Sequence, residues 1–395
     1  MSVPGGDDAE TPVGEVPPAP GTDYEFLRGA LDEAGADAFV HVGDRFDDDL
    51  RYLTRFSGPD RDYAFVFAGG TGTLCAPALF GEQAVREFPG DRVRTEALSD
   101  PAGVRAAAVL DEAIDGSGTV LVPRRLPHDA AVYLEDAGYD LVSTDAVDRA
   151  RRRKSDDELA CLRFTQRAAL RGMARAETVL AEAVPDGDVL RWESAPLTTE
   201  RLRREVNAAI AAAGARDAGN SVVGAGPTCA DLHFTGDDDV APGETVLLDL
   251  SPRGPHGYYG DVTRTFVVGE DGWGRRAYVA VESAREAALE RVEAGTPAHR
   301  VHEEAAAELA AFGFEVDSTE RGFTHGVGHG VGVSLHEGPS LRADDPLEAG
   351  HVVTIEPGVY DPERGGVRLE DLVVVTDDGH EILAEYPFSS TPRER

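Results

Sequence analysis

Four carboxylates and one histidine punctuate strand-like segments in the second half of the chain. In chain order they are Asp249, Asp261, His329, Glu356 and Glu370. Asp249 lies within the apolar run TVLLDLSP, and Glu370 lies within GGVRLEDLVVV. A carboxylate in an apolar strand is costly unless it is paired or bound to a metal ion. The pattern therefore indicates oxygen and nitrogen ligands for a cation.

These carboxylates would disturb one another if the fold brought them together. Asp261 opens the segment GDVTRTF, so a hairpin between the two strands would set Asp249 and Asp261 face to face. Acids crowded in this way raise one another's pKa unless a cation lies between them. A pair of divalent ions about 3.5–4 Å apart, bridged by carboxylates, would satisfy the whole set. Mixed carboxylate and imidazole ligation suits Mn²⁺, Co²⁺, Fe²⁺ or Zn²⁺.

The histidine of this set belongs to residues 323–339, which read FTHGVGHGVGVSLHEGP. The stretch also contains His325 and His336 among several glycines. Histidine is the usual neutral metal ligand and proton shuttle near neutral pH, and glycine lets a backbone approach a ligand closely. Taken alone, the stretch also fits a solvated surface loop, so its interpretation depends on partner residues elsewhere in the chain.

Cysteine and serine chemistry is less favoured. The three cysteines, Cys75, Cys161 and Cys229, are far apart and form no CxxC pair, so neither a disulfide framework nor a cysteine zinc site is expected. Ser334 lies near His336, which raises a Ser/His/Asp triad as an alternative. The phrase VGVSLHEG lacks the glycine-framed nucleophile turn of such hydrolases, which argues against the triad.

The elements that must position these residues fall into two domains. Over residues 23–150, apolar strand-like runs alternate with helical spacing, which predicts an α/β domain. Residues 1–22 are rich in proline, glycine and acids, and we expect a disordered tail there. Ser155 followed by Glu158 forms a capping box, which predicts a long helix at the start of a second domain, residues 151–395.

Within the second domain, helical spacing predicts helices over residues 199–213 and 275–292. Four further runs are strand-like, namely residues 246–250, 263–268, 352–355 and 367–375. Antiparallel strands joined by turns, with helices on one side, are typical of an α+β domain.

The charge of the chain is strongly negative. Its 38 Lys+Arg against 73 Asp+Glu give a net charge of −35, and Lys154 is the only lysine. Because such self-repulsion is screened at molar salt, we infer a salt-rich cytoplasm, as in a halophile. A nucleic-acid-binding surface is not expected. The absence of a long apolar run or signal features predicts a cytoplasmic protein without membrane contact.

Four phrases of the second domain resemble those of a known family. DLSPRGPHGYYGDVTRTF, HGVGHGVGVSLHEGP, TIEPGVY and GGVRLEDLVVVT resemble, in this order, the pita-bread-fold metallopeptidases: methionine aminopeptidase, aminopeptidase P and prolidase, with the metal-free creatinases as relatives. The resemblance covers residues 154–387. KSDDELACLR and RYLTRFSG also resemble phrases of the prolidase branch, which has an additional N-terminal domain. The resemblance implies an α+β chain, with a C-terminal pita-bread (creatinase/aminopeptidase) fold after a smaller N-terminal α/β domain.

The resemblance also implies a role for each of the five ligand candidates. Asp249 would chelate one metal ion, and Asp261 and Glu370 would bridge both ions. His329 and Glu356 would complete the ligands of the other ion. A hydroxide that bridges the two ions would attack the scissile carbonyl, and Glu356 would accept the proton of the bridging water.

Other matching residues would act on the substrate. His233, His325 and His336 match histidines that contact substrate and help to stabilise the tetrahedral intermediate. Tyr360 and Arg368 match positions that orient the site. One departure is the spacing from Asp249 to Asp261, which is one residue longer than the resemblance leads us to expect. An extra residue in the wrong place would turn Asp261 away from the shared face.

The implied function is a dinuclear metal-dependent exopeptidase that cleaves the Xaa-Pro bond of dipeptides or of peptide N-termini. Its ions would be Mn²⁺ or Co²⁺, with Zn²⁺ or Fe²⁺ as further candidates, its substrate a peptide with proline after the scissile bond, and its assembly a homodimer. Two alternatives stay open: a catalytically silent pita-bread module that binds a protein or peptide partner, and a metal-free creatinase-like hydrolase. Members of both kinds lose metal ligands, whereas the whole set is present in this chain.

Overall fold

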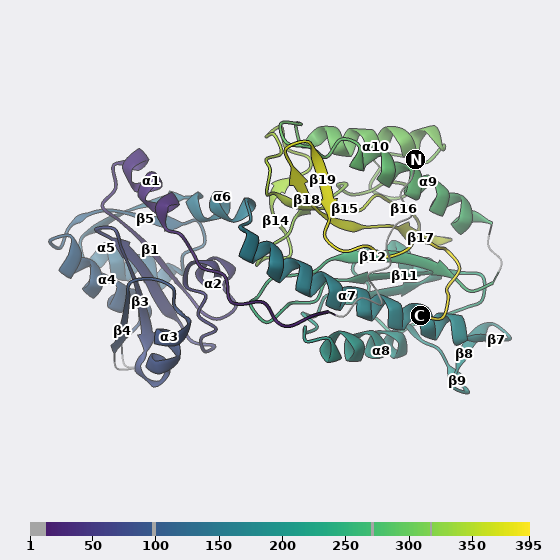
Figure 1. The fold of residues 1–395 in the computed structure, drawn as a ribbon, viewed down its shortest axis with the longest axis horizontal. Coiled ribbons are helices and arrows are strands. Elements are labelled where there is room, and N and C mark those ends of the chain that lie inside the picture. The colour runs from purple at the N-terminus through teal and green to yellow at the C-terminus, as the bar shows by residue number, and fades with distance from the viewer. Residues whose placement is uncertain (1–12, 97–99, 270–271, 317) are drawn as a thin grey trace. The chain divides into compact units, whose positions relative to one another are not determined.

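The chain forms two units in the computed structural model, which describes residues 13–96, 100–269, 272–316 and 318–395. One unit is Pro18–Arg151, and the other contains Arg152–Arg395. Figure 1 shows the elements of both. No helix among the described residues is both long and apolar enough to cross a membrane.

The N-terminal unit is built on a mixed six-stranded sheet with the order β4-β3-β2-β1-β5-β6. Its strands are β1 (Ala38–Gly43), β2 (Tyr63–Ala68), β3 (Thr71–Pro77), β4 (Arg92–Glu96), β5 (Gly118–Pro123) and β6 (Tyr139–Thr144). Its helices are α1 (Glu25–Ala34), α2 (Asp48–Thr54), α3 (Gly81–Glu87), α4 (Ala102–Ala113), α5 (His128–Asp136) and α6 (Ala146–Arg152), with a 3-10 turn at Ala78–Phe80. Strands β1 and β2 are fully buried, which fits their almost wholly apolar sequences.

The predicted tail over residues 1–22 is described only from residue 13 onward. The end of that segment is hydrogen-bonded: the Thr22 hydroxyl donates to the carbonyl of Tyr52 over 2.6 Å, and Arg55 donates to the carbonyl of Gly21 over 3.1 Å. Ordered chain therefore begins before residue 23, because a buried arginine of the first unit binds it. Residues 1–12 lie outside the described residues.

The described residues of the C-terminal unit form an α+β domain of four helices and several small antiparallel sheets. Its helices are α7 (Asp156–Glu182), α8 (Thr199–Ala212), α9 (Trp273–Leu289) and α10 (His299–Ala311), with a 3-10 turn at Gly226–Ala230. Its strands are β7 (Val184–Asp186), β8 (Val189–Trp192), β9 (Ala195–Pro196), β10 (Val222–Ala225), β11 (Thr245–Leu250), β12 (Val262–Val267), β13 (His329–Gly330), β14 (Glu337–Ser340), β15 (Val352–Ile355), β16 (Gly358–Asp361), β17 (Gly365–Arg368), β18 (Asp371–Thr376) and β19 (Gly379–Ile382).

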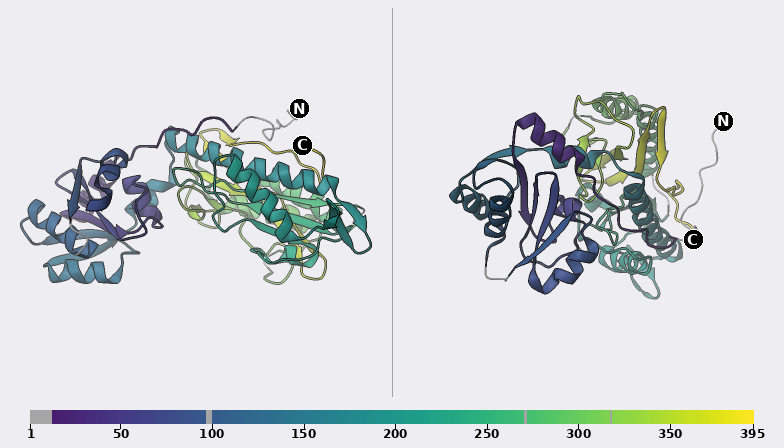
Figure 2. Two further views of the ribbon diagram at one scale, coloured as in Figure 1. Left: turned by 90° about the horizontal axis from the view of Figure 1, so that it is seen from below. Right: turned by 60° about the vertical axis from the view of Figure 1, so that its left-hand side comes forward.

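Helix α7 begins where the sequence predicts. The Ser155 side chain accepts from the Glu158 backbone N–H, and the Glu158 carboxylate accepts from the Ser155 N–H, which is a complete capping box. The buried face of α7 packs against α8, β11 and β12 (Figures 1 and 2). Helices α9 and α10 pack against each other, and α9 also contacts β15, β16 and β17. Each helix pair thereby covers its own group of strands.

The sheets divide the strands that carry the candidate ligands. One sheet has the order β10-β11-β12, another has the order β14-β13-β15-β18-β19, and β16 pairs with β17 as a hairpin. The strand-like run 367–375 was predicted as one strand, and that prediction is wrong. The run divides into β17 and β18, which belong to different sheets, because the Glu370 N–H between them donates to the carbonyl of Thr263 over 3.1 Å.

Candidate metal centre

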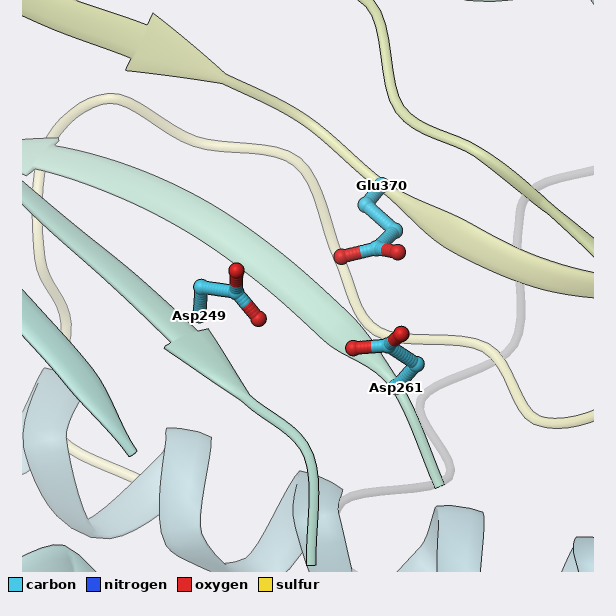
Figure 3. Close-up of side chains that lie close together, drawn as sticks. All are labelled: Asp249, Asp261 and Glu370. Atoms are coloured by element: carbon cyan, nitrogen blue, oxygen red, sulfur yellow. The ribbon is translucent and has the colours of Figure 1, made fainter. Parts of the chain in front are cut away.

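Three carboxylates converge where these sheets meet. Asp249 is the second-last residue of β11, Asp261 directly precedes β12, and Glu370 lies between β17 and β18. One carboxylate oxygen from each lies within 4.8 Å of the others, and Figure 3 shows the three side chains directed toward one another. Residues far apart in sequence thus supply one compact group of oxygen atoms.

The hairpin between β11 and β12 keeps Asp261 on the shared face despite its longer loop. Asp249 pairs with Thr263 and Leu250 with Val262, so Asp261 stands two residues before the partner of Asp249, on the same side. Gln166 of α7 holds the backbone of Asp261: its side-chain oxygen accepts from the Asp261 N–H over 2.7 Å, and its nitrogen donates to the Asp261 carbonyl over 2.8 Å. The extra residue is absorbed within the loop.

His329 and Glu356 lie beside the three carboxylates. Because Nδ1 of His329 donates to the carbonyl of Gly330 over 3.0 Å, its Nε2 carries the lone pair. This Nε2 lies 3.4 Å from a carboxylate oxygen of Glu356 and 3.8 Å from one of Asp261. Burial lowers the pKa of His329, which favours the neutral ring. The lone pair of His329 and the carboxylate oxygens of Asp261 and Glu356 are all hydrogen-bond acceptors, so a proton or a cation must lie between them. A bound metal ion would meet this requirement.

Burial and crowding oppose ionisation of the acids. Asp261 and Glu370 are 3% and 2% exposed. Burial raises the pKa of both well above the usual range, Asp249 adds to the effect on Asp261, and Asp261 adds to the effect on Glu370. Burial likewise raises the pKa of Glu356 to about 7. Divalent cations would remove this penalty, since they hold such carboxylates in the ionised form.

Hydroxyl groups that no sequence motif marks orient the acids. Thr263 donates to Glu370 over 2.6 Å, and Ser251 donates to Asp261 over 3.0 Å. Thr354 donates to Glu356 over 3.2 Å and accepts from the backbone N–H of His329 over 3.0 Å. Such partners fix the orientation of metal ligands. The only sign of Ser251, Thr263 and Thr354 in the sequence is that each lies two residues from a candidate ligand. Serine and threonine are common in strands of every kind, so this sign is weak.

Arg368, Tyr360 and His325 form a chain of hydrogen bonds that leads to Asp249. Arg368 donates from Nη2 to Asp249 and from Nη1 to the Tyr360 hydroxyl over 2.9 Å. Nδ1 of His325 donates to the carbonyl of Gly326 over 2.7 Å, so Nε2 accepts from the Tyr360 hydroxyl over 2.8 Å. Burial lowers the pKa of His325 to about 3, in keeping with a neutral ring. Both nitrogens of His325 therefore have protein partners in this arrangement.

His336 and His233 lie at the exposed side of the centre. The rings of His336 and His329 have centroids 4.2 Å apart. Both His336 and His233 are exposed. Partial burial and the neighbouring rings of His329 and His233 lower the pKa of His336. His233 also lowers the pKa of Glu356, which places it near the acids, although no hydrogen bond joins it to them in the described chain.

The chain resembles known peptidases over most of the C-terminal unit. Residues 160–377 match the family model of metallopeptidase family M24. A probable dipeptidase, PepE, from Mycobacterium tuberculosis is 33% identical over 243 residues, which is 60% of each chain. The Xaa-Pro dipeptidase of Pyrococcus furiosus is 34% identical over 170 residues, which is 42% of this chain and 47% of that one. The matches thus span about half to three fifths of these curated relatives.

The likeness of folds extends further than the likeness of sequences. The solved structure of an Xaa-Pro dipeptidase from Bacillus anthracis superposes with a TM-score of 0.81 and covers 93% of this chain and 98% of that one, at 24% identity. At that identity the superposition establishes a common fold. It includes both units of the chain, so the smaller N-terminal domain also has a counterpart there.

Proposed function

Because the chain belongs to metallopeptidase family M24, we propose that it is an exopeptidase that cleaves the Xaa-Pro bond of dipeptides or of peptide N-termini. The proposal is supported above all by one observation. Asp249, Asp261 and Glu370 each bring a carboxylate oxygen within 4.8 Å of the others, and the lone pair of His329 faces carboxylate oxygens of Asp261 and Glu356. The preference for proline after the scissile bond is supported by the name of the Pyrococcus relative.

Two divalent ions would be held by Asp249, Asp261, His329, Glu356 and Glu370. Bound there, the ions would acidify water and polarise a carbonyl group. Mn²⁺ and Co²⁺ are our first candidates, because this set contains oxygen and nitrogen donors and no thiolate. The cysteines of the chain are buried and none belongs to the cluster.

The remaining steps follow from the protein groups themselves. Bound ions would keep the Glu356 carboxylate ionised, so it would be available to accept a proton from water. His336 and His233 present exposed imidazoles beside the cluster, where they would donate to the substrate carbonyl or carboxylate. Arg368 and Tyr360 hold Asp249 and His325 in place from the buried side.

Hydrolysis of an Xaa-Pro dipeptide beside a longer Xaa-Pro peptide tests the proposal, in molar KCl with Mn²⁺ or Co²⁺ added and with a chelator as control. Cleavage of the dipeptide alone would identify a prolidase, and preference for the longer peptide an aminopeptidase P. The Asp261→Asn variant should lose activity, and unchanged turnover in that variant would contradict the assigned centre.

The same preparations separate the alternatives. If the folded wild-type protein holds two metal ions per chain but cuts neither peptide, the peptidase proposal stands and the proposed preference for proline is wrong. A folded protein that takes up no stoichiometric divalent ion and stays inert would instead be a silent binding module. Activity that survives complete removal of metal would indicate a creatinase-like hydrolase.

A further inference from the structure

The only lysine of the chain lies buried against the loop that carries His336. The side chain of Lys154 is 1% exposed and that of its partner Glu337 is 7% exposed. Nζ of Lys154 donates to Oε1 of Glu337 over 2.7 Å and to the carbonyl of Arg152 over 3.2 Å. A buried ammonium and a buried carboxylate persist only when each compensates the other, so this pair fixes two segments to each other.

Glu337 uses its carboxylate to shape the turn that precedes it. Its Oε2 accepts from the backbone N–H of Ser334 over 3.4 Å, and the N–H of Gly332 donates to the carbonyl of Ser334 over 3.0 Å. The carboxylate fills the inside of this turn, since a Cβ at Gly332 would lie 2.3 Å from Oε1 of Glu337. The turn is thereby folded around the acid that Lys154 holds.

His336 is the residue between this turn and Glu337. Its ring lies against the ring of His329 with a centroid distance of 4.2 Å and an interplanar angle of 44°. His336 and Glu337 are joined by one peptide bond. A shift of the Glu337 backbone would therefore move the His336 ring relative to the ring of His329. The ion pair thus lies one residue away from an exposed imidazole beside the candidate metal centre.

Lys154 is itself held in place by its backbone. Its N–H donates to the carbonyl of Gly350 over 2.9 Å, and its neighbour Arg153 forms a β-bridge with His351. These residues directly follow Arg151, the last residue of the N-terminal unit. The start of the C-terminal unit is thus anchored to the segment after the histidine loop, which makes it a fixed support for that loop.

We propose that Lys154 is a positioning residue for His336 and acts through the carboxylate of Glu337. This inference rests on the proposed function, in which His336 contacts the substrate. Replacement of Lys154 by methionine keeps the length and apolar stem of the side chain and removes the ammonium. It should lower kcat on the order of 10- to 100-fold, the usual effect of a misplaced catalytic group, with KM and metal content nearly unchanged.

A double-mutant cycle with His336→Ala distinguishes positioning from a general loss of stability. If Lys154 acts through His336, Lys154→Met should cause no further loss of activity in the His336→Ala background. An equal loss in both backgrounds would overturn the proposal. Arg395→Met is the matched control, because it breaks another largely buried ion pair, with Glu177, and should leave kcat unchanged.

Two further arms keep the test decisive. If Lys154→Met does not fold, Lys154→Met/Glu337→Gln removes both charges and should fold while kcat stays low; full recovery of kcat would contradict the proposal. Independently of catalysis, the imidazole nitrogen resonances of His336 in zinc-loaded, ¹⁵N-histidine-labelled protein should shift in Lys154→Met and not in Arg395→Met. Unchanged His336 resonances in Lys154→Met would overturn the positioning role. This test does not depend on whether the wild type cleaves any peptide.

Discussion

Arg368 donates from Nη2 to Oδ2 of Asp249 over 2.5 Å, so a guanidinium that is 3% exposed shares a carboxylate with the candidate metal centre. The same guanidinium donates to the hydroxyls of Thr263 over 3.2 Å and of Tyr360 over 2.9 Å. Burial opposes the charge of Arg368, but Tyr360 and then Asp249 raise the pKa of Arg368 above its usual value. Arg368 therefore balances the negative charge of the centre from its buried side.

Replacement of Arg368 by lysine should weaken the centre. A lysine keeps the charge but cannot reproduce the planar fork that meets three acceptors at once. Loss of such a supporting group typically costs 10- to 100-fold in metal affinity or activity, so we expect a decrease of about that size in metal affinity, kcat/KM or both. Titration with Mn²⁺ and steady-state kinetics measure it. Arg163→Lys is the control, because Arg163 pairs with Glu381 at the surface; equal effects of the two variants would contradict the prediction.

Replacement of Asp261 by asparagine should uncouple stability from metal ions. In the metal-free protein the variant removes one of the crowded acids whose pKa burial raises, so its melting temperature should exceed that of the wild type. Addition of Mn²⁺ should raise the melting temperature of the wild type by mass action and leave that of the variant unchanged. Differential scanning calorimetry with and without chelator measures both effects. An equal response of both proteins to Mn²⁺ would remove Asp261 from the ligand set.

His351 should make the protein less stable in mild acid. Burial, and next the charge of Lys154, lower the pKa of His351 to about 4, and its Nδ1 accepts from the Glu348 N–H over 3.1 Å. The unfolded chain therefore binds the proton first, so stability falls as pH falls from about 6.5 toward 4. Between pH 7 and 5 we expect a loss on the order of 1 kcal/mol from this ring, with allowance for solvent screening.

The variant His351→Asn isolates that contribution. Asparagine offers an oxygen acceptor near the position of Nδ1 and does not titrate, so its free energy of unfolding should depend less steeply on pH than that of the wild type. Urea unfolding at pH 5, 6 and 7 gives the comparison. The exposed residue His128, with the variant His128→Asn, serves as the control. Parallel pH profiles for wild type and His351→Asn would refute the assignment.

Salt should stabilise the fold. The net charge of −35 means that the excess carboxylates repel one another in dilute buffer, and molar salt shortens the range of that repulsion to a few ångströms. An increase of KCl from 0.1 to 2 M should raise the melting temperature by roughly 5 °C or more, equivalent to about 2 kcal/mol. Sucrose at matched osmolality controls for solvent exclusion and should have a smaller effect. A melting temperature independent of KCl would refute the inference of adaptation to salt.

The features that could be predicted from the sequence are those that depend on residues adjacent in the chain. The capping box at Ser155 is local, and so is the apolar strand that makes Asp249 conspicuous, although its side chain is 17% exposed. The break at Glu370 was missed because β17 and β18 are both almost wholly buried, and the contact between the Glu370 N–H and the Thr263 carbonyl joins residues far apart in the chain. Gln166 and Lys154 were missed for the same reason, since their partners Asp261 and Glu337 lie far along the chain and no local pattern links them.

The crossing of the chain at Glu370 also has a thermodynamic consequence. Asp249 and Glu370 stand at the ends of a long stretch of chain, and their carboxylates meet at one point. An ion bound by both would act as a reversible cross-link that closes the loop 249–370. Because unfolding separates the two ends of this loop, the ion is released when the domain unfolds, so its binding free energy stabilises the folded state by mass action. Metal supply would then set how long the folded domain survives in the cell, apart from its effect on turnover.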